Sequence, residues 1–508
     1  MKILFIYPNA GSQVGFNYGL AHISALLKQK GHQVVLWQLC EKLDPLPSRH
    51  EFLERLKELS PELIGFSVVT NQWPYTQKLA GWVREGSDAP VVCGGIHATA
   101  TPKAILETGL FDFVFRGESE EAFLEFVEAL EAGNDLGQIR NLGLVRYGRI
   151  QINPVRELPD LERMPMKDYE VFDFQRIIDA KDGWVGLMAS RGCPFSCTYC
   201  LNHQVVALYK KDLDCGFRQL NYIRHFDLDQ LLFEIKYLIE RYSNIKMFIF
   251  DDDLFTFDRA YVAEFCRRYR ELCRIPFVVN AHVGFFDATM ARQLAEANCR
   301  IVKFGIESGS PRIRKLILNR HMKNEKIVDA IRNAHRYGLH SSVFLMIGLP
   351  DEKREDVMAT IRLVGEAKPG RFRWSFFFPF PGTRAYELSV EMGYVDFKKM
   401  SDLANFTEAS CLDFGPEQNL FLEKVGAAMP WFVNAYSNLP TADAYAVQAE
   451  RILELDPVAW EKEAVSIRKQ DKAMSREFVR QGLSHYAIKY NPFMGVISDY
   501  FVQEEQEQ

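Results

Sequence analysis

The sequence predicts an α/β protein built from two successive series of strands and helices, followed by a helical C-terminal region. Short apolar runs of strand length alternate with amphipathic stretches of helical spacing, first over residues 1–140 and again from Gly183 onward. Beyond about Ala385 the helical spacing continues and the strand-like runs stop. The chain has 508 residues, enough for several hydrophobic cores. We therefore expect four segments, at residues 1–140, 141–180, 181–388 and 389–508.

Five apolar runs predict the strands of the first segment. They are Lys2–Tyr7, His32–Gln38, Leu63–Val69, Pro90–Cys93 and Phe111–Phe115. Helical spacing follows the first run at Tyr18–Lys30 and the last at about Ser119–Ala132. Alternating strands and helices favour a parallel sheet covered on both faces. Five such units are typical of a flavodoxin-like (Rossmann-like) domain, which binds ligands at the carboxyl ends of its strands.

A hairpin at about 141–156 and a proline-punctuated connector, Pro159–Tyr169, separate the two series. Six strand candidates follow, at Gly183–Ala189, Lys246–Phe250, Phe277–Ala281, Ile301–Gly305, Ser341–Ile347 and Arg373–Phe378. Helices are expected between them, for example at Leu228–Tyr242, Arg259–Cys273, Ala288–Ala297 and Asn324–Tyr337. Six units favour a partial (β/α)6 barrel of the TIM type over a closed barrel of eight.

Composition narrows the classes of function and location. Lys and Arg total 61 against 67 Asp and Glu, and no basic stripe stands out, which argues against a nucleic-acid partner. No run of about 18 apolar residues predicts a membrane span. The N-terminus lacks the pattern of a signal peptide, and seven of the ten cysteines are scattered. We expect a protein of the reducing cytosol.

The three clustered cysteines lie in Arg191-Gly-Cys-Pro-Phe-Ser-Cys-Thr-Tyr-Cys200, directly after a predicted strand. Cys193, Cys197 and Cys200 have the spacing C-x-x-x-C-x-x-C, and three thiolates on one loop can bind three irons of a cubane cluster, leaving the fourth iron open. A zinc site completed by His203 is the alternative.

This loop, with the six-unit series behind it, resembles the radical S-adenosylmethionine superfamily. The resemblance implies a 4Fe–4S cluster whose open iron binds S-adenosylmethionine. One electron from the cluster then gives methionine and a 5′-deoxyadenosyl radical, while the protein orients the reactants and excludes quenchers.

Later segments carry the same resemblance, which implies that S-adenosylmethionine contacts Tyr199 and the loops that follow the later strands. Asp251 or Asp252 would hold the methionine amine, although an N-cap role for Asp253 or Asp258 explains part of this acidic run. Two further segments contribute to this group. Glu307 and Ser308 lie in Gly305-Ile-Glu-Ser-Gly-Ser310, and Glu307 would contact the ribose. Gly348 and Pro350 lie in Gly348-Leu-Pro-Asp-Glu352 and would lie beside the adenine.

Asn280 and His282 alternate onto one face of their strand, where both could point into the barrel. A structural hydrogen-bonding role for the histidine is equally open. We assign no catalytic residue.

The first domain lacks the dinucleotide fingerprint G-x-G-x-x-G after its first strand, which argues against a nicotinamide cofactor. Gly94-Gly-Ile-His-Ala-Thr99 and Arg116-Gly-Glu-Ser resemble the cobalamin-binding domains that are fused to radical S-adenosylmethionine proteins. The resemblance implies cobalamin contacts at Ser67, Gly94, Gly95, His97, Thr99, Gly117 and Glu118. The motif D-x-H-x-x-G is missing and His97 lies in a different loop, so we expect no histidine beneath cobalt. A domain that has lost its cofactor is the alternative.

Taken together, the resemblance implies a cobalamin-dependent enzyme that methylates an unactivated carbon, or phosphorus, of a small molecule. An electron donor such as flavodoxin or ferredoxin would serve the cluster. Cyclisation, rearrangement or oxidation by the same machinery is the second enzyme hypothesis. A non-catalytic iron–sulfur or cobalamin-sensing protein is the alternative outside enzymes. The C-terminal region is expected to cap the barrel or to act as a substrate-selecting lid.

Overall fold

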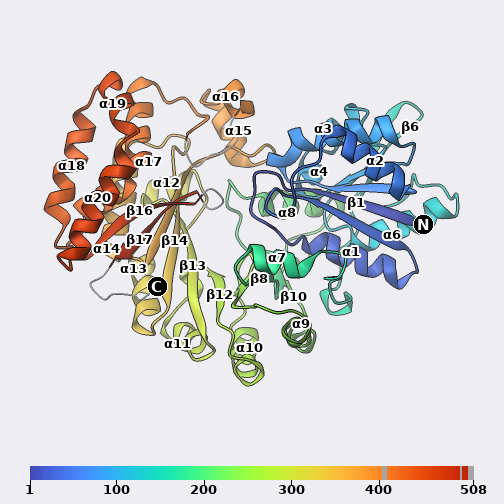
Figure 1. Ribbon diagram of the computed structural model, residues 1–508, viewed down its shortest axis with the longest axis horizontal. Helices are drawn as coiled ribbons and strands as arrows, with labels where there is room; N and C mark the ends of the chain where they lie inside the picture. Colours follow the sequence, from blue (N-terminus) through green and yellow to red (C-terminus); the bar gives the residue numbers. More distant parts are fainter. Residues whose placement is uncertain (403–408, 492–494, 502–508) are drawn as a thin grey trace. The chain divides into compact units, whose positions relative to one another are not determined.

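The computed structural model describes residues 1–402, 409–491 and 495–501. The chain forms two compact units (Figure 1). Unit 1 contains Met1–Pro194 and Leu201–Phe248, and unit 2 contains Phe195–Cys200 and Ile249–Gln508. The six residues of unit 2 that interrupt unit 1 include the last two of the clustered cysteines. Within the described residues, no helix is long and apolar enough to cross a membrane.

Unit 1 is built on a seven-stranded sheet in the order β2-β1-β3-β4-β5-β6-β7. Its strands are β1 (Lys2–Pro8), β2 (Gln33–Leu39), β3 (Leu63–Ser67), β4 (Val91–Gly94), β5 (Phe113–Phe115), β6 (Leu142–Arg146) and β7 (Arg149–Ile152). The first five pair in parallel and have the strand order of a flavodoxin-like domain, as predicted. The predicted hairpin forms as β6 and β7, which extend the sheet in antiparallel pairing beside β5.

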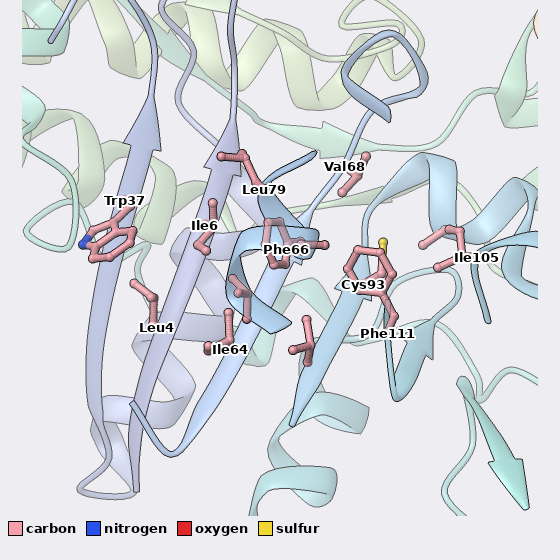
Figure 2. Packing of buried hydrophobic residues seen from close by; sticks show 14 of the residues in the cluster. Leu4, Ile6, Trp37, Ile64, Phe66, Val68, Leu79, Cys93, Ile105 and Phe111 are labelled. Atoms are coloured by element: carbon pink, nitrogen blue, oxygen red, sulfur yellow. The ribbon is translucent and has the colours of Figure 1, made fainter. Parts of the chain in front are cut away.

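Alternating side chains of β1 bury both faces of this sheet, as the two-residue period of a strand requires. Leu4 and Ile6 join the core shown in Figure 2, which includes side chains of α2 (Arg49–Leu59) and α3 (Trp73–Gly86). Phe5 points the other way, and its ring centre lies 5.5 Å from that of Phe123 in α6. The helices of this domain are α1 (Tyr18–Gln29), α2, α3, α4 (Ile96–Ala100), α5 (Pro102–Glu107) and α6 (Glu120–Glu131).

The remainder of unit 1 contains the chain on either side of the cysteine loop. Its elements are α7 (Phe174–Ala180), β8 (Trp184–Leu187), β9 (Ser190–Arg191), α8 (Leu201–Asp212), β10 (Arg224–His225) and α9 (Leu228–Arg241). Strands β9 and β10 form a short antiparallel ladder in which Arg191 is opposite Arg224. Gly192 follows with φ +96°, and a Cβ there would lie 2.2 Å from the carbonyl oxygen of Tyr222, so only glycine fits this turn into the loop.

The later strands of the second series are β11 (Met247–Phe250), β12 (Phe277–Ala281), β13 (Cys299–Glu307), β14 (His340–Ile347) and β15 (Arg371–Phe376). With β8, they form at the six predicted positions. Strands β12 to β15 pair in parallel. The helices between them are α10 (Arg259–Leu272), α11 (Ala288–Glu296), α12 (Pro311–Leu316), α13 (Asn324–Arg336) and α14 (Arg354–Ala367).

The C-terminal region is helical, as predicted, through α15 (Arg384–Glu391), α16 (Phe397–Asp402), α17 (Pro416–Ala435), α18 (Ala442–Glu454), α19 (Pro457–Ala464) and α20 (Ile467–Arg480). It then adds a hairpin that the sequence analysis missed, β16 (His485–Asn491) and β17 (Gly495–Phe501). Strand β17 pairs antiparallel with β15, so the order in unit 2 is β16-β17-β15-β14-β13-β12. This edge hairpin contacts α17 and α20, and such long-range pairing leaves little local signal.

Candidate functional site

Phe195–Cys200, the part of the cysteine loop that belongs to unit 2, is anchored by hydrogen bonds on both sides of Cys197. The hydroxyl of Thr198 donates to the carbonyl of Ile317 at 2.5 Å, and its backbone N–H donates to that of Leu318. The Asn319 amide donates to the carbonyl of Ser196 at 2.9 Å. These bonds fix the backbone next to Cys197, a buried residue, and thereby limit where its sulfur can lie.

Arg320 connects this loop to the end of β13. Its guanidinium donates to Cys197 Sγ at 3.4 Å, to Tyr199 Oη at 3.2 Å and to the carbonyl of Gly305 at 2.6 Å. The Tyr199 hydroxyl in turn donates to Glu307 Oε1 at 3.1 Å. Burial raises the pKa of Glu307, and the charge of Arg320 and the Tyr199 hydrogen bond act against that rise. A fixed positive charge therefore lies beside one of the cysteine ligands predicted for the cluster.

Glu307 holds a left-handed backbone conformation with φ +67°, which is uncommon for a residue with a side chain. The pairing of β13 with β14 shifts register between Gly305 and Glu307, so the strand bulges where its side chain turns toward Tyr199. Two of the predicted S-adenosylmethionine contacts, Tyr199 and Glu307, thus lie together.

The predicted acidic residues lie directly after β11. Asp251 is exposed, whereas Asp252 is buried and its backbone carbonyl accepts a 2.9 Å hydrogen bond from the Asn280 amide at the end of β12. Asp258 is the N-cap of α10 and accepts from the N–H groups of Ala260 and Tyr261, so its capping role is confirmed.

The His282 ring stacks on Phe195 of the cysteine loop, with ring centres 4.2 Å apart. Its Nδ1 accepts a hydrogen bond from the N–H of Gly284. Burial, helped by the charge of Arg320, lowers the pKa of His282 to about 3, so the imidazole is neutral near pH 7. The ring therefore supports Phe195 and the short turn that follows β12.

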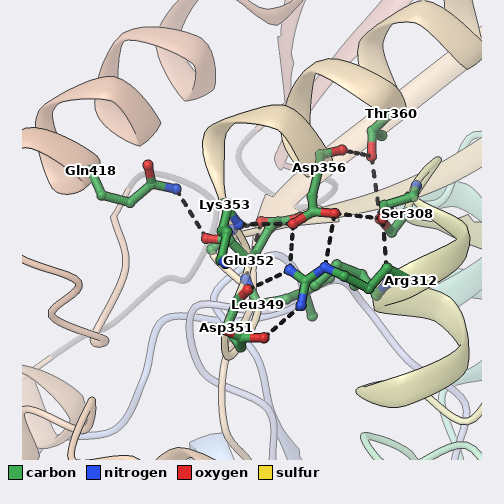
Figure 3. Close-up of polar contacts among 12 residues, drawn as sticks. Ser308, Arg312, Leu349, Asp351, Glu352, Lys353, Asp356, Thr360 and Gln418 are labelled. Carbon is green, nitrogen blue, oxygen red and sulfur yellow. Dashed lines mark hydrogen bonds and ion pairs between the residues drawn. The ribbon is translucent and has the colours of Figure 1, made fainter.

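The loop after β14 folds around the carboxyl group of Glu352 (Figure 3). Glu352 Oε2 accepts from the N–H of Gly348 at 2.6 Å and of Leu349 at 3.2 Å, while Oε1 is buried and has no hydrogen-bond partner among the described residues. Burial raises the pKa of Glu352 to about 8. Gly348 has φ +73°, and Pro350 is buried. Glu352 thus fixes the backbone at Gly348, one of the two positions predicted to lie beside adenine, and at the neighbouring Leu349.

Ser308 lies inside a buried polar cluster at the start of α12 and α14 (Figure 3). Its hydroxyl lies 3.3 Å from Thr360 Oγ1 and accepts from the N–H of Ser310 at 3.2 Å. Asp356 accepts from the Ser310 hydroxyl at 2.6 Å and pairs with Arg312. The Ser308 side chain therefore fixes the turn that follows Glu307.

The predicted cobalamin contacts of unit 1 lie at the carboxyl ends of adjacent strands. Ser67 and Gly94 are register partners at the ends of β3 and β4. The Asn17 amide, at the N-cap of α1, donates to the Ser67 hydroxyl at 2.9 Å. Gly95 has φ +94°, and a Cβ there would lie 2.6 Å from the carbonyl oxygen of Val68. This turn therefore requires glycine.

His97 and Thr99 hold the loops together. The two His97 ring nitrogens lie 3.4 and 3.3 Å from the hydroxyls of Thr70 and Thr101, and burial lowers the pKa of His97 to about 4. The Thr99 hydroxyl accepts from the N–H of Gly117 at 2.9 Å, which joins the loop after β4 to the loop after β5. Both carboxylate oxygens of Glu118 pair with arginines, Arg191 and Arg224.

Among the described residues, no three His, Cys, Asp or Glu side chains are grouped so that they could hold a single metal ion. A cubane cluster makes a different demand, because its cysteines bind separate irons.

Two family models match the chain, one over each series of strands and helices. The family model of the radical SAM superfamily matches residues 187–364, and that of the B12 binding domain matches residues 11–127. An uncharacterized methyltransferase of Pyrococcus horikoshii is 29% identical over 403 residues, covering 77% of this chain and 83% of the relative. Cytidylyl-2-hydroxyethylphosphonate methyltransferase of Streptomyces wedmorensis is 24% identical over 462 residues, with coverages of 78% and 83%. Anaerobic magnesium-protoporphyrin IX monomethyl ester cyclase of Rubrivivax gelatinosus is 22% identical over 435 residues, with coverages of 82% and 75%.

Two solved structures share the fold. The radical S-adenosylmethionine methyltransferase TsrM of Kitasatospora setae has a TM-score of 0.63 at 19% identity, covering 77% of this chain and 76% of that one. The cobalamin-dependent S-adenosylmethionine radical enzyme OxsB has a TM-score of 0.66 at 13% identity, with coverages of 94% and 75%.

The cysteine loop, the strand ends and the two domain matches define a radical S-adenosylmethionine enzyme. More particularly, the chain combines a radical S-adenosylmethionine domain with a B12-binding domain, and its cofactors are a 4Fe–4S cluster, S-adenosylmethionine and cobalamin.

The residues present fit these cofactors. The Arg320 guanidinium donates to Cys197 Sγ, and a positive donor at this place would stabilise the negative charge of an iron–sulfur cluster. Ser67 and Gly94 are half-buried at the strand ends, where a hydroxyl and a backbone without a side chain leave room for a large ligand.

The roles of Arg320 and Asn17, and the packing role of Glu352, were not predicted from the sequence. Arg320 lies 123 residues from Cys197 in the sequence, and it belongs to no spacing motif that would indicate its role. A helix N-cap pattern gives Asn17 a local role and hides its bond to Ser67.

Replacing Arg320 by Gln should lower the reduction potential of the cluster, because a positive hydrogen-bond donor to a cluster sulfur favours the reduced, more negative state. Arg320→Lys, which keeps the charge, should give a smaller shift. A redox titration followed by electron paramagnetic resonance measures both. Arg300→Gln, at an exposed position in β13, is the matched control. An equal shift in that control would contradict a specific role for Arg320.

Glu352→Gln should make the stability of the folded protein fall less as pH rises. The folded pKa of Glu352 is raised to about 8 from 4.5, so its favourable contribution is present below pH 4.5 and is lost as pH rises through 8. The variant should therefore gain stability relative to the parent between these values, by on the order of a few kcal/mol at most. Thermal denaturation at pH 5 and pH 9 measures the difference, with exposed Glu355→Gln as control. Parallel pH profiles for parent and Glu352→Gln would refute the assignment.

Proposed function

We propose that this enzyme is a cobalamin-dependent methyltransferase that acts on an unactivated carbon, or on phosphorus, of a small-molecule substrate. The observation that carries the proposal is the presence of both cofactor domains in one chain whose relatives include methyltransferases. The cluster and S-adenosylmethionine supply the 5′-deoxyadenosyl radical, and cobalamin supplies the methyl group. We further propose that the enzyme works in the cytosol with a flavodoxin or ferredoxin as electron donor.

In this proposal Cys193, Cys197 and Cys200 bind the cluster. Tyr199, Asp251, Asp252, Glu307, Ser308, Gly348 and Pro350 form the S-adenosylmethionine site. Tyr199 and Glu307 act as a pair oriented by Arg320, and the exposed Asp251 is the better placed of the two aspartates for a ligand amine. Ser308 acts by holding the turn after Glu307.

The cobalamin site is proposed at Ser67, Gly94, Gly95, His97, Thr99, Gly117 and the backbone of Glu118, whose carboxylate pairs with Arg191 and Arg224. Ser67, Gly94 and Gly95 would contact the cofactor, and His97 and Thr99 would hold the two neighbouring loops through their hydroxyl and amide partners. The corresponding domain boundaries are 1–140 for cobalamin binding, 141–180 for the hairpin and linker, 181–388 for the barrel and 389–508 for the helical region.

A cyclase is the second candidate, favoured by the similarity to the Rubrivivax gelatinosus enzyme. The products of S-adenosylmethionine distinguish the two. A methyl donor leaves S-adenosylhomocysteine, whereas reductive cleavage leaves 5′-deoxyadenosine. Reconstituted protein with reductant and hydroxocobalamin should form both if it is a methyltransferase. Deoxyadenosine without S-adenosylhomocysteine would support the cyclase, and formation of neither would support a non-catalytic protein.

Cys197→Ala should abolish formation of 5′-deoxyadenosine, because the cluster would lose one of its three protein ligands. After anaerobic reconstitution we expect reduced iron content with cobalt content unchanged. Metal analysis and chromatography of the products measure this. Deoxyadenosine formation at the parent rate would contradict the cluster assignment.

Ser67→Leu should lower cobalt occupancy while leaving iron content unchanged, because a branched side chain would occupy space at the proposed cofactor edge. Ser67→Ala, which removes only the hydroxyl, should have a smaller effect. The Cys197→Ala protein is the reciprocal control, since it should lose iron and keep cobalt. Parent-level cobalt in Ser67→Leu would refute this placement of cobalamin.

A further inference from the structure

The loop Arg116–Ser119, which follows β5 in the B12-binding domain, bonds to the chain on both sides of the cysteine loop. The Glu118 carboxylate pairs through Oε2 with Arg191 at 2.6 Å, and Arg191 lies two residues before Cys193. The backbone N–H of Glu118 donates to the Tyr209 hydroxyl at 2.8 Å, and Tyr209 belongs to α8, which begins directly after Cys200. One residue therefore holds the entry to the cysteine loop and the helix that leaves it.

Neighbouring contacts strengthen both attachments. Arg191 also pairs with Glu120 at 2.7 Å, and Arg116 lies 3.5 Å from Asp212 at the end of α8. At Gly117, where φ is +68°, a Cβ would lie 2.5 Å from the Tyr209 hydroxyl, so the close approach of loop and helix requires glycine.

The carboxylate of Glu118 is fully committed to these contacts. Its second oxygen pairs with Arg224, the partner of Arg191 across the β9–β10 ladder, and Arg224 donates on to the carbonyl of Pro159 at 2.7 Å. Although burial by itself would raise the pKa of Glu118, Arg191 and Arg224 lower it, so the group stays ionised near pH 7. A charged, doubly paired side chain on a loop is stiff, because moving it would separate charges in a poorly solvated place.

We propose that Glu118 is a positioning residue for the iron–sulfur loop, and that it transmits a change at the cobalamin edge of the first domain to Arg191 and Tyr209. The inference rests on the proposed function for the identity of the two cofactors. In this proposal the Glu118 side chain holds the cysteine loop, and neighbouring residues contact cobalamin.

The test is hydrogen exchange of the full-length protein, reconstituted with iron and sulfide, with and without hydroxocobalamin. Glu118→Gln keeps the shape and removes the charge. Glu121→Gln is the matched control, because Glu121 lies close by in the first turn of α6, is exposed, and pairs with Arg156 at 3.7 Å. Without cobalamin, amides of residues 189–193 should exchange about tenfold faster in Glu118→Gln than in parent or control, as expected for loss of a charged hydrogen bond.

Addition of hydroxocobalamin should slow exchange in residues 189–193 and 201–209 in the parent and in Glu121→Gln. In Glu118→Gln we expect no such slowing at equal bound cobalt, and an electron paramagnetic resonance spectrum of the reduced cluster that no longer responds to cobalamin. A role in stability alone would not change that response. Tyr209→Phe, a milder variant, should weaken the slowing in residues 201–209 only.

Exchange in Glu118→Gln equal to that in Glu121→Gln would overturn the proposal. Loss of bound cobalt in Glu118→Gln alone would also overturn it, because the side chain would then serve cobalamin directly. If the parent binds no cobalt, the proposed methyl carrier fails, and transmission from a cobalamin edge fails with it. The comparison without cobalamin then shows whether Glu118 still holds the loop.

Discussion

In a parallel sheet every strand ends at the same edge, so residues that follow different strands become neighbours whatever their separation in sequence. Both parts of the site depend on this constraint. In unit 1 it sets Ser67 beside Gly94, and it brings the loops after β4 and β5 within a Thr99–Gly117 hydrogen bond. In unit 2 it gathers the ends of β11 and β12, where Asn280 bonds to the backbone of Asp252. The loops proposed to hold the cofactors therefore depend on strand order, and their side chains adjust positions that the sheet has already fixed.

Buried polar groups fix these loop positions more closely, because such groups have few alternative hydrogen-bond partners. A charged group away from water is stable only with partners, so each such group fixes the loop that supplies them. The guanidinium of Arg320 joins Cys197, Tyr199 and the backbone of Gly305 in this way. The carboxyl group of Glu352, which burial keeps mostly uncharged near pH 7, fixes the backbone of Gly348 and Leu349 by accepting hydrogen bonds from their N–H groups. Loops of this kind are arranged before a ligand arrives, which lowers the conformational entropy lost on binding.

The features that could be predicted from the sequence are those that depend on residues close together along the chain. The strands β1 to β5 and β11 to β15 appear as apolar runs because many of their residues are buried, in β1 on both faces, and the cysteine spacing marks its own loop. Arg320 and the pairing of Glu118 with Arg191 left no such trace, since their partners are 123 and 73 residues away. The β16–β17 hairpin was missed for the same reason, because its stability comes from β15 and the helices α17 and α20.

The network around Glu118 also explains how charge is buried within unit 1. Two carboxylates, Glu118 and Glu120, face two guanidinium groups, Arg191 and Arg224, so the group is neutral as a whole. An apolar contact at this place would tolerate sliding, because hydrophobic attraction has little directional preference. Paired ions fix both distance and direction, and separating them in a poorly solvated place is costly. An ion-pair network is therefore suited to a place where the first domain must hold the cysteine loop in one position.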